Sequence, residues 1–148
     1  MKYRLAIDDF ELNGYTLISP LKGQNPIKIG EYLDDGEAEE IICDNILENI
    51  PTENLMVFIR ALSSKLKHGG ILVFTGTDVM MLVEKYTRGE ISIIDFNKIL
   101  FGLKNYAWAF KLACITLSDI NEICEQVGLK VLERKLDGTE FCIKVQRA

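Results

Sequence analysis

The sequence predicts an α/β protein with a mostly parallel sheet and an antiparallel hairpin at its C-terminal end. Two observations support this prediction. Between residues 41 and 74, a short apolar run, a helix-period segment, a Gly-Gly turn and a second apolar run follow one another. Such a strand, helix, strand unit needs a right-handed crossover, so its two strands should be adjacent and parallel. Near residue 137, Asp-Gly separates two strand-like runs, which is a strong signal for a two-residue hairpin.

The central unit contains two predicted strands, Ile41–Cys43 and Ile71–Phe74. We expect a helix between them that begins after the N-cap residue Thr52 and ends at Gly69 and Gly70. The apolar residues of this helix recur at steps of three and four: Leu55, Phe58, Ile59, Leu62 and Leu66. Packing the helix on two parallel strands buries this stripe and the apolar strand faces together.

The residues before this unit predict two short strands, 3–7 and 15–19. The turn-rich stretch between them has no room for a crossover helix, so the N-terminal half of the fold should be reduced. The stretch from Pro20 to Asp35 is expected to be a loop with a short strand at Ile27–Ile29.

The residues after the central unit predict three helices and the hairpin. Apolar periodicity indicates helices over residues 79–86 and 91–103. Ser118 is the expected N-cap of the third helix, with acidic residues in its first turn. The hairpin strands are expected at residues 129–136 and 140–145.

Length and charge bound the function. The 148 residues are expected to form a single domain, 1–148. The net charge of -5 and the scattered Lys and Arg residues argue against a nucleic-acid partner. No apolar run approaches the roughly 18 residues of a membrane span, and the N-terminal residues do not resemble a signal peptide. We therefore expect a cytoplasmic protein without membrane contact.

The metal-binding residue types are sparse. The four cysteines have no C-x-x-C spacing, and His68 is the only histidine. Zinc sites need clustered ligands, so we expect no metal site.

Polar residues follow the strand at Ile41–Cys43, where Asp44, Asn45, Leu47 and Glu48 stand in the loop. This loop should open at the carboxyl edge of the sheet, where open α/β folds bind ligands. Position as well as residue type therefore favours a ligand role for Asp44 and Asn45. Glu48 could contact a substrate or, equally, cap or ion-pair near the following helix.

Four short motifs follow one another along the chain: Leu47-Glu48-Asn49, Leu66-Lys67-His68-Gly69-Gly70, Thr116-Leu117-Ser118-Asp119-Ile120 and Val127-Gly128-Leu129. This series resembles class I S-adenosylmethionine-dependent methyltransferases of the small, glycan-associated kind. In that family Leu-Glu-His, a helix and Leu-Lys-Pro-Gly-Gly lie between two strands, and Thr-Ser and Ala-Gly-Phe motifs follow. The resemblance covers roughly residues 38 to 145.

The resemblance implies a Rossmann-like methyltransferase fold, reduced in its N-terminal half, and S-adenosylmethionine as cofactor. It also implies cofactor contacts near the N-terminus. Ala6 and Asp8 stand where the family carries glycine in the first turn, and Ser19 stands where an acid holds the ribose hydroxyls. Glycine lets the backbone approach a ligand closely, so these changes weaken the usual contacts.

The resemblance further places Asp44, Asn45 and Leu47 beside the cofactor and makes Glu48 the nearest base for a hydroxyl acceptor. Methyl transfer needs two reactants held in line and, for a hydroxyl, a base. The acceptor would be a small molecule or a glycan. The alternative is a non-catalytic binding or assembly module that has kept the fold and lost the cofactor. A sheet face without its crossover helix would also favour a homo-oligomer.

Overall fold

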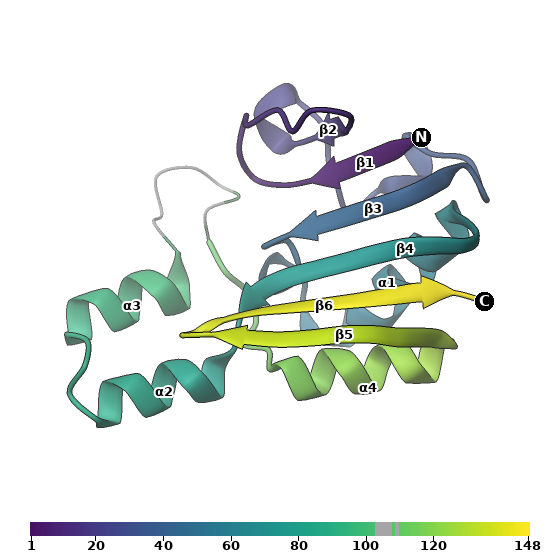
Figure 1. Cartoon of the computed structure of the whole chain (residues 1–148). Coiled ribbons are helices and arrows are strands. Elements are labelled where there is room, and N and C mark those ends of the chain that lie inside the picture. Colours follow the sequence, from purple (N-terminus) through teal and green to yellow (C-terminus); the bar gives the residue numbers. More distant parts are fainter. Residues whose placement is uncertain (103–107, 109) are drawn as a thin grey trace.

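The computed structural model describes residues 1–102, 108 and 110–148, and its strands form one six-stranded sheet in the order β2-β1-β3-β4-β6-β5 (Figure 1). The strands are β1 (Lys2–Leu5), β2 (Thr16–Ile18), β3 (Ala38–Asp44), β4 (Leu66–Thr77), β5 (Leu129–Asp137) and β6 (Glu140–Arg147). β1, β2, β3 and β4 pair with one another in parallel, whereas β6 is antiparallel to both β4 and β5. This confirms the predicted fold class, with its C-terminal antiparallel hairpin.

The central unit also has the predicted form. β3 and β4 are adjacent and parallel, with Ile41 opposite Leu72 and Cys43 opposite Phe74. Helix α1 (Leu55–Lys65) connects them and buries the expected stripe on the sheet. Helix α4 (Leu117–Val127) packs beside α1, against β5 and β6.

Two further helices, α2 (Val79–Thr87) and α3 (Ile93–Phe101), lie beyond the carboxyl end of β4 (Figure 1). They match the predictions for residues 79–86 and 91–103, except that α3 begins two residues later and already ends at Phe101, and that residue 103 lies outside the described residues. α2 buries only Leu82, and α3 buries none of its residues. Both helices therefore contribute little to the core.

The end of α1 was predicted wrongly. The helix ends at Lys65, and the segment from Leu66 to Gly70 belongs to β4 instead. Leu66 pairs with Ala38 across an irregular register, which extends the strand back to the helix. Gly70 is closely packed, because a Cβ there would lie 2.8 Å from the Lys67 carbonyl oxygen.

The predicted caps and the strand at Ile27–Ile29 also need correction. Thr52 lies in a 3-10 turn, Thr52–Asn54, that precedes α1, so it does not cap the α-helix. Thr116 rather than Ser118 caps α4, because its hydroxyl accepts the Asp119 N–H at 3.1 Å. Ile29 begins a short 3-10 helix, Ile29–Glu31, which buries Ile29 against the core without any strand partner.

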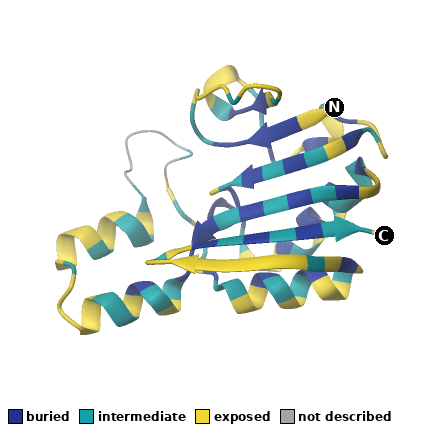
Figure 2. Ribbon diagram, in the orientation of Figure 1, coloured by how far each residue is buried: buried dark blue, intermediate teal, exposed yellow. Residues whose placement is uncertain are grey.

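Among the residues that the structure describes, helices cover only one face of the sheet. In Figure 1, α1 and α4 lie behind the sheet, and no described helix lies in front of it. As predicted, no helix connects β1 to β2. Leu72 and Phe74 on the covered face are buried, whereas Ile71 and Val73 alternate with them and stay half-buried (Figure 2). The hydrophobic core therefore forms a single layer between the sheet and two helices.

The described part of the chain has no helix of the length and apolarity that a membrane span requires. The expected cytoplasmic location stays a prediction.

The one-layer core makes a direct prediction. Ile59 is fully buried under the sheet, so Ile59→Ala should lower the free energy of unfolding by about 2–5 kcal/mol. Val57 lies on the same helix with 65% of its surface exposed, so Val57→Ala should change it by less than about 0.5 kcal/mol. Urea unfolding of both variants measures the difference. Equal losses of unfolding free energy would show that the assignment of the buried face of α1 is wrong.

Candidate functional site

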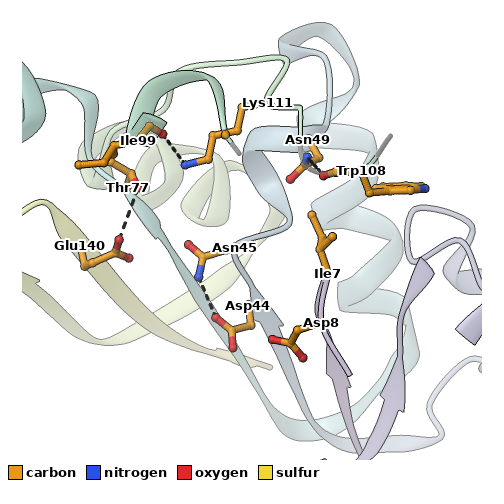
Figure 3. Close-up of a pocket in the computed structure, with 11 residues that line it drawn as sticks. Ile7, Asp8, Asp44, Asn45, Asn49, Thr77, Ile99, Trp108, Lys111 and Glu140 are labelled. Atoms are coloured by element: carbon orange, nitrogen blue, oxygen red, sulfur yellow. Dashed lines mark hydrogen bonds between the residues drawn. The ribbon is translucent and has the colours of Figure 1, made fainter. Parts of the chain in front are cut away.

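A cleft of about 410 Å³ opens at the carboxyl ends of β1, β3 and β4. Its lining comes from the ends of four strands and from the segments around α3 (Figure 3): Ile7, Asp8, Asp44, Asn45, Asn49, Thr77, Ile99, Gly102, Trp108, Lys111 and Glu140. The chain leaves β1 toward β2 on one side, while β3 lies on the other. Open α/β folds bind ligands at such a switch point.

Arg4 joins the ends of β1 and β3 at this cleft. Its Nη1 and Nη2 donate to both carboxylate oxygens of Asp8, at 2.7 and 2.8 Å, and Nη2 also donates to Asp44 Oδ2 at 2.6 Å. Nη1 donates to the Phe10 carbonyl at 3.1 Å, and the guanidinium lies over the Phe10 ring. Only 7% of Arg4 is exposed. The bonds from Arg4 hold the pKa of Asp8 below its ordinary value of 3.8.

Ala6 and Ser19 are fully buried and do not line the cleft. The Ser19 hydroxyl donates to the Asp8 carbonyl at 2.6 Å and accepts the Leu21 N–H at 3.2 Å, as the N-cap of the 3-10 turn Pro20–Lys22. The hydroxyl thus has a donor and an acceptor partner inside the protein. A contact from Ser19 to a ribose would first require this fully buried side chain to become accessible.

The loop after β3 turns sharply at Asn45, the one non-glycine residue with a left-handed backbone (φ 56°) among the residues described. Asparagine tolerates this conformation. Asp44 Oδ1 accepts from the Thr75 hydroxyl at 2.7 Å and from Asn45 Nδ2 at 3.0 Å. Asp44 and Asn45 therefore reach the cleft as their position predicted, whereas Leu47 is buried in the core.

Glu48 is buried and fully engaged. Its carboxylate accepts the Thr77 N–H at 2.6 Å and pairs with Lys111 Nζ at 2.5 Å. Lys111 Nζ also donates to the Ile99 carbonyl at 2.8 Å. Gly76 leaves room for this carboxylate, because a Cβ there would lie 2.9 Å from Glu48 Oε1. Glu48 would have to lose a partner before it could take a proton from a substrate.

Sequence reasoning missed Glu140, an exposed acid at the mouth of the cleft. Partial burial, followed by the nearby charge of Glu48, raises its pKa above the ordinary value of 4.5. A signal for this residue was present. Glu140 begins the last strand, and a strand antiparallel to β4 must start at the edge where the parallel strands end.

Sequence reasoning also missed Arg4 and the wall formed after α3. Asn49 Nδ2 donates to the carbonyls of Trp108 and Phe110, at 2.8 and 2.7 Å. These partners are 59 and 61 residues away in the chain, so no local pattern indicates them.

No group of three or more His, Cys, Asp or Glu side chains among the described residues is arranged to hold a metal ion.

No protein-family model matches the chain, and no curated protein matches it. Solved structures match its fold. Magnesium protoporphyrin IX methyltransferase from Synechocystis PCC 6803, with S-adenosylhomocysteine bound, matches with 17% identity and a TM-score of 0.56, over 92% of this chain and 52% of that one. A SAM-dependent methyltransferase from Archaeoglobus fulgidus matches with 12% identity and a TM-score of 0.58, over 97% and 74%.

A third match, a SAM-dependent methyltransferase from Methanosarcina mazei, has 11% identity and a TM-score of 0.59, over 90% of this chain and 66% of that one. The chain has the Rossmann-like fold of class I S-adenosylmethionine-dependent methyltransferases, as the sequence motifs predicted. At these identities the likeness concerns the fold. The chain spans about half of the first matched protein and 36% of the next, an O-methyltransferase family protein from Burkholderia thailandensis.

The residues present do not fit S-adenosylmethionine at its nucleoside end. Adenosine needs a close backbone approach after β1 and an acceptor for the ribose hydroxyls after β2. Here Asp8 is tied to Arg4, and the Ser19 hydroxyl is buried and bonded. The Arg4 cation also occupies the two carboxylates that a positively charged sulfonium would otherwise approach.

The Arg4 cluster predicts a pH-dependent stability. Arg4→Met should cost about 1–3 kcal/mol at neutral pH, because it leaves Asp8 and Asp44 without their partner. The cost stays below that of a fully buried pair, because 45% of the Asp8 side chain and 28% of the Asp44 side chain are exposed. Because the pKa of Asp8 is lowered in the folded state, its ionised carboxylate stabilises the folded protein at pH values above the ordinary pKa of 3.8. This stabilisation is lost as the pH falls through the folded-state pKa.

The difference in unfolding free energy between wild type and Arg4→Met should therefore shrink below pH 3.8. Urea titrations at about pH 7, 5 and 3 measure it. Lys2→Met is the control, since Lys2 on the same strand makes a partly exposed pair with Glu40 at 3.5 Å and lies over the Tyr15 ring, away from Asp8 and Asp44. A difference that does not vary with pH would contradict the assignment.

For Glu140 we predict a pH dependence of stability opposite to that of the Arg4 cluster. Because its folded-state pKa is raised, the folded state is favoured below the ordinary value of 4.5 and loses this advantage as the pH rises through the folded-state value. Glu140→Gln should therefore be slightly more stable than wild type at pH 7, by at most about 0.5 kcal/mol because solvent screens the residue, and equal to it near pH 4. Thermal unfolding at the two pH values tests this, and a less stable variant at pH 7 would contradict it.

Proposed function

We propose that this chain is a methyltransferase-like binding module, which uses the cleft at the carboxyl edge of its sheet for a small molecule and does not transfer methyl groups. The Arg4 cluster carries this proposal. It ties the turn after β1 to the end of β3 through three charge-assisted hydrogen bonds, at the place where the cofactor of a methyltransferase fold would approach the backbone.

The state of the acids in the cleft supports the same proposal. Glu48, the nearest base expected from the sequence, is buried with Lys111 and the Thr77 N–H on its two oxygens. A general base needs an open position within hydrogen-bond reach of a substrate proton. Glu48 is 3% exposed and is not among the residues that line the cleft, so a substrate there does not reach it.

The ligand that suits the cleft is a small molecule rich in hydrogen-bond donors. Asn45 and Glu140 present an amide and a carboxylate oxygen to the cleft, which Asp44 also borders. Trp108 and Ile99 supply apolar wall, and the volume of about 410 Å³ lies in the range of small-molecule sites. A hydroxylated molecule, such as a glycan unit, combines hydroxyl donors with the apolar ring face that such walls accept.

A second candidate is an S-adenosylmethionine-dependent methyltransferase that acts on a small molecule or glycan. The observation that favours it is Glu140, an acid with a raised pKa that borders the same cleft as Asp44 and Asn45. Under this alternative, Glu140 would replace Glu48 as the base for an acceptor hydroxyl, and Ala6, Asp8, Ser19, Asp44, Asn45 and Leu47 would be rearranged around the cofactor.

Binding in the cleft can be followed by tryptophan fluorescence, because the one tryptophan of the chain, Trp108, lines it. We expect S-adenosylhomocysteine to change neither Trp108 fluorescence nor the heat of titration up to about 1 mM. Methyl glucoside should change the fluorescence in the millimolar range, and Glu140→Ala should abolish that change.

Two results would overturn the proposal. One is S-adenosylhomocysteine binding in the low micromolar range, lost in Asp8→Ala and kept in the matched control Asp9→Ala, which alters the exposed neighbouring acid. That result would favour the second candidate, the methyltransferase. The other is no response to methyl glucoside, which would remove the proposed class of ligand.

A further inference from the structure

The α2–α3 hairpin displays exposed apolar side chains. On α2, Met80, Val83 and Tyr86 are 65%, 40% and 40% exposed, and on α3, Ile93 and Ile94 are 50% and 64% exposed. The two helices contact each other through Tyr86 and Phe96, whose ring centroids are 5.0 Å apart. We call the five exposed side chains, Met80, Val83, Tyr86, Ile93 and Ile94, the hairpin patch.

The hairpin patch is large enough for a stable interface. Its exposed fractions correspond to roughly 500 Å² of surface, taking about 150–250 Å² for a large side chain. A standard interface buries about 800 Å² on each partner, of which about two-thirds is apolar. The patch therefore supplies the apolar share of one side of a standard interface.

The charges around the patch balance. Residues 79–101 contain three acidic residues (Glu84, Glu90, Asp95) and three basic ones (Lys85, Arg88, Lys98), on a chain with a net charge of -5. A neutral region lets two copies of an acidic chain approach without the repulsion that the rest of the surface imposes. An anionic membrane surface would instead require an excess of basic residues.

We propose that the hairpin patch is the dimer interface of this protein, covered by the same patch of a second copy. A two-fold contact places one patch on itself, and two helical hairpins that meet in this way bury their apolar stripes in a four-helix arrangement. The occupant is a second copy because both the apolar area and the balanced charge are matched by the patch itself.

The open face of the sheet is a weaker interface. Its central side chains, Ile42, Ile71 and Val73, are already half-buried by their neighbours, and charged residues flank them on β1 and β6, including Lys2 and Lys144. Closing two such faces would desolvate these lysines together with apolar side chains that are already half-buried.

Sedimentation velocity of the full chain, without ligand, tests the proposal over about 1–200 µM. Wild type should pass from monomer to dimer within this range. Ile94→Lys on α3 and Met80→Lys on α2 should each weaken dimerisation at least tenfold. Val57→Lys is the matched control, because Val57 is as exposed as Met80 but lies on α1, and it should leave the dimer unchanged. Circular dichroism confirms that each variant is folded.

Three outcomes would overturn the proposal. They are a wild type that stays monomeric to 200 µM, a dimer that survives both Ile94→Lys and Met80→Lys, and a dimer that Val57→Lys dissociates. A monomeric wild type that sediments with phosphatidylcholine and phosphatidylglycerol vesicles would assign the patch to a lipid surface instead. Because no ligand is present, the result is independent of the proposed binding function.

Discussion

The cleft depends on a single buried cation. Arg4 points from β1 to the open side of the sheet, where the segment around Phe10 covers it, and a guanidinium so little exposed needs nearby negative charge. Asp8 supplies it from the same turn and Asp44 from the neighbouring strand. The cluster therefore determines how the β1 turn is shaped, which side chains border the cleft and how far their carboxylates are free to meet a ligand.

The second constraint is the one-sided sheet. The helices α1 and α4 cover one face, and all the largest buried side chains belong to that layer. The core is thus separate from the charged groups at the strand ends. Residues at the strand ends, such as Asp8 and Ser19, can therefore vary without altering the packing of α1 on the sheet.

The sequence predicted the elements whose signals are local. The unit from β3 to β4 and the final hairpin follow from apolar spacing and from Asp137-Gly138, and both are confirmed. Asp44 and Asn45 could be placed at the cleft because strand polarity determines which end of β3 faces a ligand. The extent of β4 was misjudged, because glycines that usually end helices here serve close packing inside a strand.

Charge pairing was the part that local patterns could not reveal. Glu48 and Lys111 are 63 residues apart in the chain, and Arg4 and Asp44 are 40 apart, so neither pair has a spacing that marks it. Yet these two pairs decide the chemistry of the cleft. They pair Glu48 with Lys111 and Asp44 with Arg4, which leaves Glu140 as the acid whose environment disfavours its charge. The charges at this edge are therefore determined by tertiary ion pairs, whereas the fold is determined by apolar periodicity.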